Sequence, residues 1–251
     1  MGKVPALVLG ILSLVRPKSW GPFVETFNKT SFDHAFTVSW SQGGEDLALL
    51  HLIESNSIGR YIDVGAHHPS RFSITRHLYQ QGWRGINIDA NPKTARAFKG
   101  ERPEDVFINA CVGTAKEYTF HIFDEPALST SNNSWREKLV TENQTVNSSL
   151  IIEGISLETI IHKYFEYAPD LLIVDAEGSD FDVLQSCNWK QLPKKLWPTW
   201  IVCETTPPLN VVLETPQINL LTGLGYNIYA VLPMSTILKL ERFRKEEVGS
   251  R

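Results

Sequence analysis

The sequence predicts an α/β fold in which helices cover both faces of a mostly parallel central sheet. Short apolar runs of strand length alternate along the chain with stretches whose apolar residues recur at helical spacing. Such alternation is typical of parallel sheets, because a crossover helix carries the chain back to the edge at which the preceding strand began. The 251 residues, 42% of them hydrophobic, suffice for one core of this class.

The first half of the chain supplies four of the predicted strands. The first is β-prone and is stopped by Gly65, which favours a turn directly after it. The predicted strands of this half are 60–64, 85–89, 106–112 and 118–123. Helices are predicted at 45–55, at 75–81 and in the Lys/Arg/Ala segment that ends at Lys99.

The second half continues the alternation. Residues 171–175 are almost all apolar, as expected of a central parallel strand that is buried on both faces. The other predicted strands are 200–204 and 226–232, and the predicted helices are 155–164, 179–187 and 216–224. Between the two halves, the segment from Glu125 to Val146 is polar and has no clear period, so we predict a mobile loop that selects the ligand.

Three regions are predicted along the chain. Residues 1–40 form an N-terminal extension, residues 41–238 the α/β domain, and residues 239–251 a charged tail that is a solvated helix or a frayed end. Residues 4–15 form an apolar run of 12 residues, whereas a helix that spans a bilayer needs roughly 20. We expect this run to pack on the domain as a helix, with peripheral membrane association as the alternative.

The composition narrows the classes of function and the compartment. A net charge of −4 disfavours nucleic-acid binding, which needs a basic face. The three cysteines, Cys111, Cys187 and Cys203, are too scattered for a disulfide framework and have no metal-ligand spacing. We therefore expect buried free thiols in a reducing, cytoplasmic protein without a metal site.

Four of the apolar strands end in a carboxylate, at Asp63, Asp89, Asp175 and Glu204. The carboxyl ends of parallel strands meet at one edge of the sheet, where ligands bind. A cluster of negative charge at that edge requires a cationic or hydroxyl-rich ligand. For Glu204, an ion pair with a neighbouring lysine or arginine is the equal alternative.

The turn after the first strand excludes a pyrophosphate cradle. Gly65 permits close approach of the backbone to a ligand, but His67, His68 and Pro69 stand where the GxGxxG pattern needs its later glycines. The turn therefore disfavours a nicotinamide dinucleotide as the ligand. It remains compatible with S-adenosylmethionine, which has no pyrophosphate. Asp89 lies near the offset of about 20 residues at which an acidic residue takes ribose hydroxyls.

Several motifs resemble a known family in register from about residue 41 to residue 204. They are the segments 41–46 (SQGGED), 61–69 (YIDVGAHHP), 82–92 (GWRGINIDANP), 102–103 (RP), 171–178 (LLIVDAEG) and 201–204 (IVCE). Together they resemble FkbM-family methyltransferases. The resemblance implies a Rossmann-like class I methyltransferase fold over residues 41–238, S-adenosylmethionine as methyl donor, and transfer to a hydroxyl of a sugar, a glycan or a secondary metabolite.

The resemblance also implies roles for individual residues. Asp63 and Gly65 would border the methionine part of the donor, Asp89 would take the ribose hydroxyls, and the end of the third strand would flank the adenine. The full set of implied donor-binding residues is Gln42, Asp63, Gly65, Ala66, Asp89, Ala90, Asn91, Asn109, Ala110, Cys111 and Asp175.

Asp175, Glu177, His67 and His68 are the candidates for a base that activates the acceptor hydroxyl. We place Asp175 first and Glu177 second. The alternative for Glu177 is a carboxylate stabilised at a helix N-terminus, and for the histidines it is hydrogen bonding within a turn.

Two other functions compete with methyl transfer. Asp180 and Asp182 form an Asp-x-Asp triplet, which holds a divalent metal in some glycosyltransferases, although the two side chains would diverge on a helix. A non-catalytic binding module on the same fold is the second alternative. The sequence does not determine the oligomeric state.

Overall fold

The computed structural model describes residues 38–54, 57–205 and 208–241. The apolar run at 4–15 and the end of the tail, 242–251, lie outside the described residues. Within them, no helix combines the length and the apolar character that crossing a bilayer requires. The three cysteines are buried and unpaired, as predicted.

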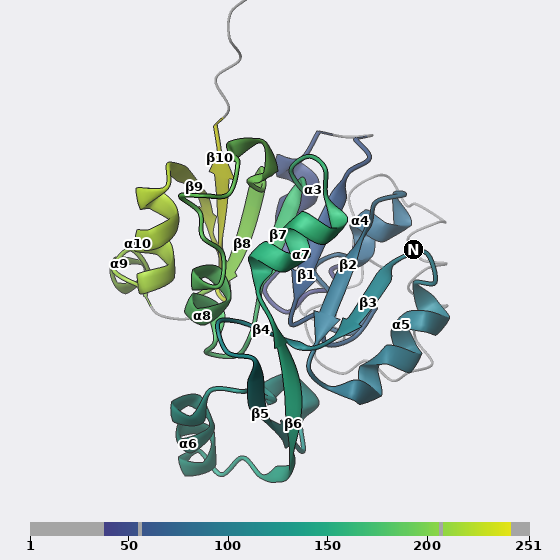
Figure 1. Cartoon of the computed structure of the whole chain (residues 1–251), viewed down its shortest axis with the longest axis vertical. Helices are drawn as coiled ribbons and strands as arrows, with labels where there is room; N and C mark the ends of the chain where they lie inside the picture. The colour runs from purple at the N-terminus through teal and green to yellow at the C-terminus, as the bar shows by residue number, and fades with distance from the viewer. Residues whose placement is uncertain (1–37, 55–56, 206–207, 242–251) are drawn as a thin grey trace, which may run out of the picture.

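Seven strands form the central sheet in the order β3-β2-β1-β7-β8-β10-β9 (Figure 1). Their bounds are Arg60–Val64 for β1, Arg84–Asp89 for β2, Val106–Asn109 for β3, Leu171–Val174 for β7, Trp200–Glu204 for β8, Tyr226–Val231 for β9 and Ser235–Leu240 for β10. Strands β1, β2, β3, β7 and β8 are parallel, and β10 runs antiparallel to both of its neighbours. The predicted parallel sheet is therefore confirmed, with an antiparallel pair at one edge.

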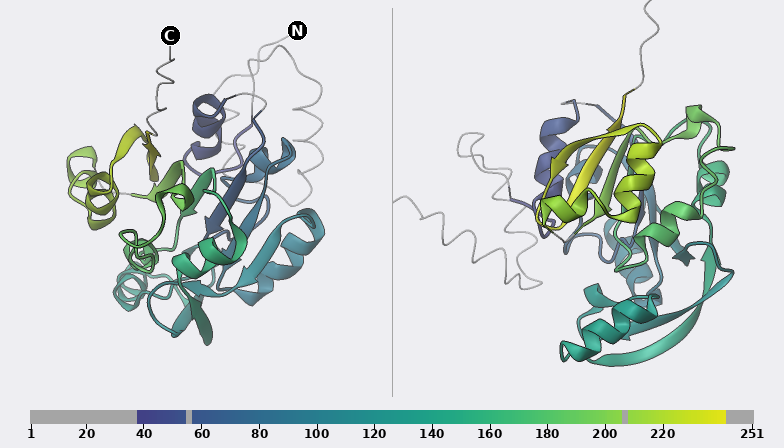
Figure 2. Two further views of the ribbon diagram at one scale, coloured as in Figure 1. Left: turned by 45° about the horizontal axis from the view of Figure 1, so that its top comes forward. Right: turned by 90° about the vertical axis from the view of Figure 1, so that its left-hand side faces the viewer.

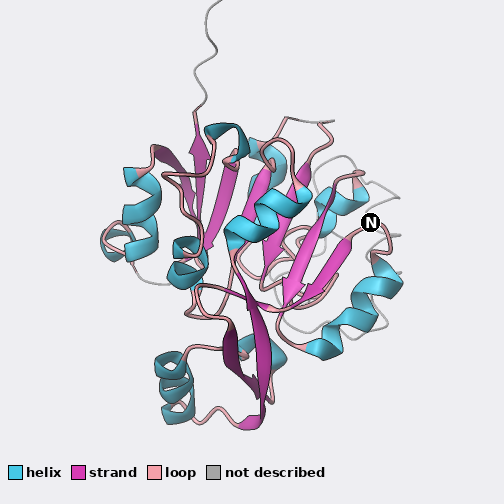
Figure 3. Cartoon of the chain, in the orientation of Figure 1, coloured by secondary structure: helices cyan, strands magenta, loops and turns pink. Residues whose placement is uncertain are grey.

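Helices lie on both faces of this sheet (Figure 3). The α-helices outside the arm described below are α3 (Glu45–Leu52), α4 (Arg76–Gln80), α5 (Ala95–Glu101), α7 (Leu157–Tyr164), α8 (Asp180–Gln185), α9 (Leu209–Val212) and α10 (Pro216–Gly223), and the short 3-10 helices are η3 (Pro92–Thr94) and η5 (Lys194–Leu196). Alternate strand residues divide between the two faces, as the strand period of two requires. Ile62 and Val174 pack with α7, α8 and α10, whereas Tyr61 and Ile173 pack with α3 and α4.

A second, three-stranded sheet, β4-β6-β5, forms an arm of residues 111–155 at the edge where β1 and β2 end (Figures 1 and 2). The arm consists of β4 (Cys111–Val112), β5 (Glu117–Phe123), η4 (Pro126–Leu128), α6 (Asn133–Thr141) and β6 (Val146–Ile155). The single strand predicted at 106–112 was wrong in extent, because the chain leaves the main sheet after Asn109 and pairs with β6 instead. The arm leads into α7 and then β7, so it is part of the crossover from β3 to β7.

The prediction of an unstructured loop from Glu125 to Val146 was wrong. The Asn132 side chain caps α6 by accepting a hydrogen bond from the Trp135 N–H, and Leu139 is the buried residue of this helix. A mostly polar helix that buries a single residue shows no hydrophobic period. The tail prediction was also wrong at its start, since β10 includes residues 239–240.

The ends of β1 and β7 approach each other closely. Asp175 N–H donates to the Val64 carbonyl, and Gly65 has φ +80°. A side chain at position 65 would collide with the Asp175 carbonyl oxygen. The glycine predicted to stop the first strand therefore also permits this contact.

Replacing Gly65 with alanine should destabilise the domain strongly. The added Cβ would lie 1.6 Å from the Asp175 oxygen, and the positive φ adds strain. We expect a loss of about 2–5 kcal/mol in the free energy of unfolding, measured by urea denaturation. Gly225→Ala is the matched control, because its φ is +99° but nothing lies within 4 Å of the added Cβ, so about 1–2 kcal/mol is expected. Equal losses in the two variants would contradict the close approach.

Candidate functional site

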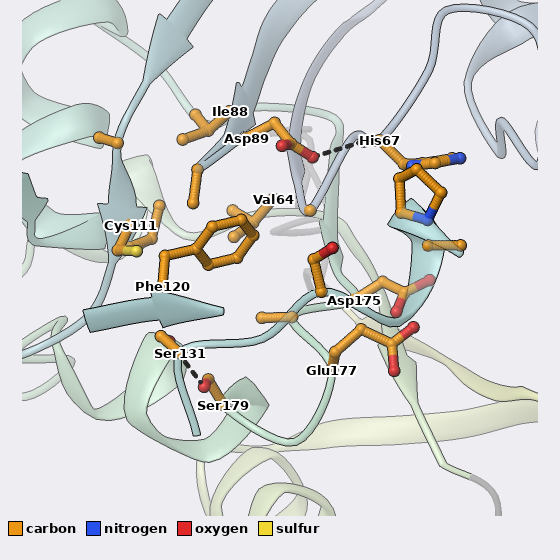
Figure 4. A pocket seen from close by; sticks show the side chains of 18 of the residues that line it. Val64, His67, Ile88, Asp89, Cys111, Phe120, Ser131, Asp175, Glu177 and Ser179 are labelled. Atoms are coloured by element: carbon orange, nitrogen blue, oxygen red, sulfur yellow. Dashed lines mark hydrogen bonds between the residues drawn. The ribbon is translucent and has the colours of Figure 1, made fainter. Parts of the chain in front are cut away.

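The main cavity lies where the strand order reverses, between β1 and β7. Ligands of open α/β sheets bind beyond the carboxyl ends of the strands at this point. The space within it that no protein atom fills, open solvent at its mouth included, is about 760 Å³. Its lining comes from the ends of β1, β2 and β7, from the loop after β1, and from the arm (Figure 4).

Asp89, at the end of β2, accepts hydrogen bonds from the loop that follows β1 and from the turn that follows β2. One carboxylate oxygen accepts the N–H of His67 at 2.8 Å, and the other accepts the N–H of Asn91 at 2.7 Å. Burial raises the pKa of Asp89 to about 6, against the opposing effect of these two hydrogen bonds. Each oxygen keeps a second lone pair, so the carboxylate can accept hydroxyl donors from a ligand in the cavity.

An apolar surface lies beside Asp89. Ile88, Cys111 and Phe120 surround this part of the cavity, as Figure 4 shows. Burial raises the pKa of the Cys111 thiol to about 12, so this thiol is neutral at physiological pH. Such a surface suits a flat, uncharged ring.

The opposite side of the cavity carries carboxyl groups. In Figure 4, those of Asp175 and Glu177 lie together on the side away from Cys111 and Phe120. Burial, followed by the charge of Glu177, raises the pKa of Asp175 well above its usual value, and the described residues give its carboxyl group no hydrogen bond. Burial also raises the pKa of Glu177 to about 7, although the Trp135 N–H, 3.3 Å from Oε2, opposes this.

A second cavity of about 430 Å³ adjoins the first. The two share Gln42, Phe72, Asp175 and Glu177. The second cavity adds the carboxyl groups of Glu45 and Glu204, the Ser235 hydroxyl, and an apolar surface of Ile74, Ile173, Val174, Val202 and Met234. Burial, followed by the charge of Asp175, raises the pKa of Glu204 to about 10. No basic side chain is among the described residues that line this cavity.

Three residues other than glycine that line the main cavity have left-handed backbones. They are His67 at φ +48°, Phe72 at φ +58° and Glu177 at φ +47°. Such conformations cost roughly 1–3 kcal/mol each and persist where the surrounding structure holds them, commonly at functional sites.

The two histidines differ in their surroundings. His67 Nε2 lies 2.9 Å from an Arg71 guanidinium nitrogen, which donates to it, and Arg71 also makes two hydrogen bonds to Glu125 of the arm. Burial and the Arg71 charge lower the pKa of His67 to about 4, so the imidazole is neutral near pH 7. Its Nε2 already accepts the hydrogen bond from Arg71. His68 Nδ1 accepts the N–H groups of Ser70 and Arg71, which favours the predicted alternative of a histidine bonded within a turn.

The structure brings most of the predicted site residues to the main cavity. Those that line it are Gln42, Gly65, His67, Asp89, Ala90, Ala110, Cys111, Asp175 and Glu177. Those that do not are Asp63, Ala66, His68, Asn91 and Asn109. Asp63 lies behind the cavity and accepts a hydrogen bond from Thr75, and the Asn109 amide donates to the carbonyls of Asp89 and Ala90.

Sequence reasoning missed the contributions of the arm and of α3. The missed lining residues include Phe72 and Glu45, and from the arm Phe120, Pro126, Ala127, Ser129 and Ser131. A buried Glu at the start of α3 has the same sequence signal as an ordinary first-turn acid. Phe120 lies in the predicted strand 118–123, and the other arm residues lie in the polar segment predicted to select the ligand, but no signal in the sequence distinguished the individual lining residues.

The Asp-x-Asp triplet does not form a shared site. The Asp182 carboxylate accepts the hydroxyls of Thr114 and Tyr118, whereas the Asp180 carboxylate accepts the Ala176 N–H. The two side chains therefore diverge, as expected on a helix. Across the described ranges, no group of His, Cys, Asp and Glu has a geometry that could hold a metal ion.

Comparison with known proteins gives one family match, in which the family model described as the methyltransferase FkbM domain matches residues 63–228. No curated protein matches the sequence. Among solved structures, the human methyltransferase 10 domain containing protein has 10% identity and a TM-score of 0.48, covering 96% of this chain and 100% of that one. Precorrin-6y C5,15-methyltransferase from Geobacter metallireducens GS-15 has 10% identity and a TM-score of 0.41, covering 78% and 87%.

The stability of the protein should depend on pH through Asp63, which is 5% exposed. Burial raises the pKa of Asp63 to about 6, so the folded protein binds this proton more tightly than the unfolded chain does. The proton on Asp63 contributes its full stabilisation below the pKa that this group has in the unfolded chain. This stabilisation is lost as the pH rises through 6. We therefore compare the free energy of unfolding of Asp63→Asn with that of the wild type, by denaturant titration at pH 5 and at pH 7.5. The difference, variant minus wild type, should be about 1–2 kcal/mol more positive at pH 7.5 than at pH 5. A difference that stays constant with pH would contradict the raised pKa.

Proposed function

Since the chain belongs to the FkbM methyltransferase family, we propose that it transfers the methyl group of S-adenosylmethionine to a hydroxyl group of a sugar, a glycan or a secondary metabolite. The match to residues 63–228 confirms the predicted family, and the predicted Rossmann-like class I fold is confirmed with it. One observation carries the proposal: two cavities meet at Asp175 and Glu177, as the sites of a donor and an acceptor must meet at the reacting atoms.

The main cavity suits the donor in its chemistry. The apolar surface of Ile88, Cys111 and Phe120 would take the adenine, and the spare lone pairs of Asp89 would take the ribose hydroxyls. Gln42 and the turn at Gly65 would border the methionine part, next to carboxyl groups that favour a cation. When bound, S-adenosylmethionine supplies an electrophilic methyl carbon attached to a positively charged sulfur.

The second cavity suits an acceptor that donates hydrogen bonds. Its carboxyl groups accept hydrogen bonds from hydroxyls, and its apolar side can pack against the carbon face of a ring. Anionic acceptors, such as phosphorylated compounds, would find no basic side chain among the described residues that line this cavity. The proposed acceptor is therefore hydroxylated and not anionic.

Asp175 is the proposed base. A sugar hydroxyl is a weak nucleophile, so a base within hydrogen-bond reach accelerates its attack. The Asp175 carboxyl group lines both cavities and has a raised pKa, which suits a proton acceptor near neutral pH. It would take the hydroxyl proton onto a carboxylate oxygen, while the bond from the hydroxyl oxygen to the methyl carbon forms and the bond from that carbon to the donor's sulfur breaks. Glu177 remains the second candidate.

The donor assignment is tested with S-adenosylhomocysteine, the product of methyl transfer. We expect a dissociation constant of the order of 1 μM by calorimetry, equivalent to about −8 kcal/mol. Asp89→Ala should weaken binding by roughly 1.5–3 kcal/mol, the value of hydrogen bonds to a charged group. Because Asp89 also holds two turns, the control is the 2′,3′-dideoxy analogue: the wild type should prefer the hydroxylated ligand, and the variant should lose this preference. A variant that discriminates between the two ligands as the wild type does would refute the ribose contact.

The base assignment is tested with Asp175→Asn, which keeps the shape and removes the proton acceptor. The rate of labelled-methyl transfer to hydroxylated acceptors should fall about 10²–10⁴-fold, with little change in S-adenosylhomocysteine affinity. Asp182→Asn is the control, because its carboxylate is bonded outside both cavities and its loss should affect stability alone. Wild-type turnover by Asp175→Asn would assign the role to Glu177.

A further inference from the structure

The arm is fastened to the turn that carries Glu177. Thr130, which is buried, donates its hydroxyl to the Glu177 carbonyl oxygen at 2.7 Å. The Asn132 side-chain amide donates to the next carbonyl, that of Gly178, at 2.6 Å. These two contacts hold the backbone of the turn from the side of the arm.

Trp135 holds the side chain of the same residue. Its indole N–H donates to Glu177 Oε2 at 3.3 Å. The indole also lies against Gly178, where an added Cβ would be only 3.0 Å from Trp135 Cβ and Cγ. On its other side, the Lys138 ammonium group lies 4.1 Å from the ring centroid. The ring is therefore fixed by contacts around it.

Glu177 needs such support, because a left-handed backbone is unfavourable for a residue with a side chain and persists only where its neighbours impose it. We propose that Thr130 and Trp135 are positioning residues, which hold Glu177 in its left-handed conformation and aim its carboxyl group at the junction of the two cavities. The part that Glu177 then plays toward an acceptor rests on the proposed function, whereas the contacts themselves do not.

Helix α6 thus acts on the site through Glu177 without lining either cavity. The Trp135 N–H favours the ionised form of the carboxyl group to which it donates. Removing this donor must therefore make Glu177 harder to ionise. Since burial raises the pKa of Glu177 to about 7, the change falls in a pH range where the folded protein can be studied.

The test follows the ionisation of Glu177 in the full-length protein without ligand. Its side-chain carboxyl carbon-13 resonance is assigned by its loss in Glu177→Gln. Trp135→Phe keeps an aromatic ring and removes the N–H donor, so the midpoint of the titration should rise by about 0.5–1 pH unit. Thr130→Val keeps the shape of the side chain and removes the hydroxyl, and it should move the midpoint in the same direction by freeing the turn.

Trp189→Phe is the matched control, because it removes an indole donor to the Leu184 carbonyl in the core. It should lower stability and leave the Glu177 midpoint unchanged. A midpoint that stays at the wild-type value in Trp135→Phe overturns the proposal, and so does an equal rise in Trp189→Phe. If Trp135→Phe does not fold, an unchanged midpoint in Thr130→Val decides against it. S-adenosylhomocysteine binding by the wild type, measured on the same sample, tests the proposed methyl transfer separately.

Discussion

The close approach of β1 and β7 is the constraint on which the site depends. Gly65 passes so near to the Asp175 carbonyl that no side chain fits between them. This contact brings the ends of two strands, 110 positions apart in the sequence (175 − 65), to one point beside the strand-order reversal. The loop after β1, whose His67 N–H donates to Asp89, and the turn after β7, which carries Glu177, both start from these two strand ends.

The second organising feature is an excess of carboxyl groups without basic partners in the cavities. Burial raises the pKa of Asp175, Glu177, Asp180 and Glu204, so the ligand-free site is neutralised in part by protons. A carboxyl group that holds its proton near neutral pH can release it when a cation arrives, and the carboxylate that results can then take a proton from a hydroxyl. The electrostatic cost of gathering these groups is therefore consistent with a ligand site, where perturbed ionisation is common.

The main sheet and its strand-end residues could be predicted because their physical signals are local. Residues 171–175 are apolar as a buried strand must be, and Gly65 and Asp89 stand at strand ends, where topology brings them together. Of the arm, β5 was predicted, but α6 and β6 could not be, because α6 buries little and β6 includes the polar residues 147–149. The resemblance implied that Asp63 borders the donor, but its carboxylate accepts a hydrogen bond from Thr75 and does not line the main cavity.

The arm enters and leaves the domain at neighbouring points. Cys111 at its start pairs with Gly154 near its end, so the intervening chain returns to within one strand spacing of where it departed. A segment with such adjacent ends can be lengthened, shortened or exchanged between homologous genes without changing the order of the main strands. Because this segment contributes Phe120 to the main cavity and Trp135 to the surroundings of Glu177, recombination there would reshape the wall of the main cavity while the strands of the main sheet stay in place.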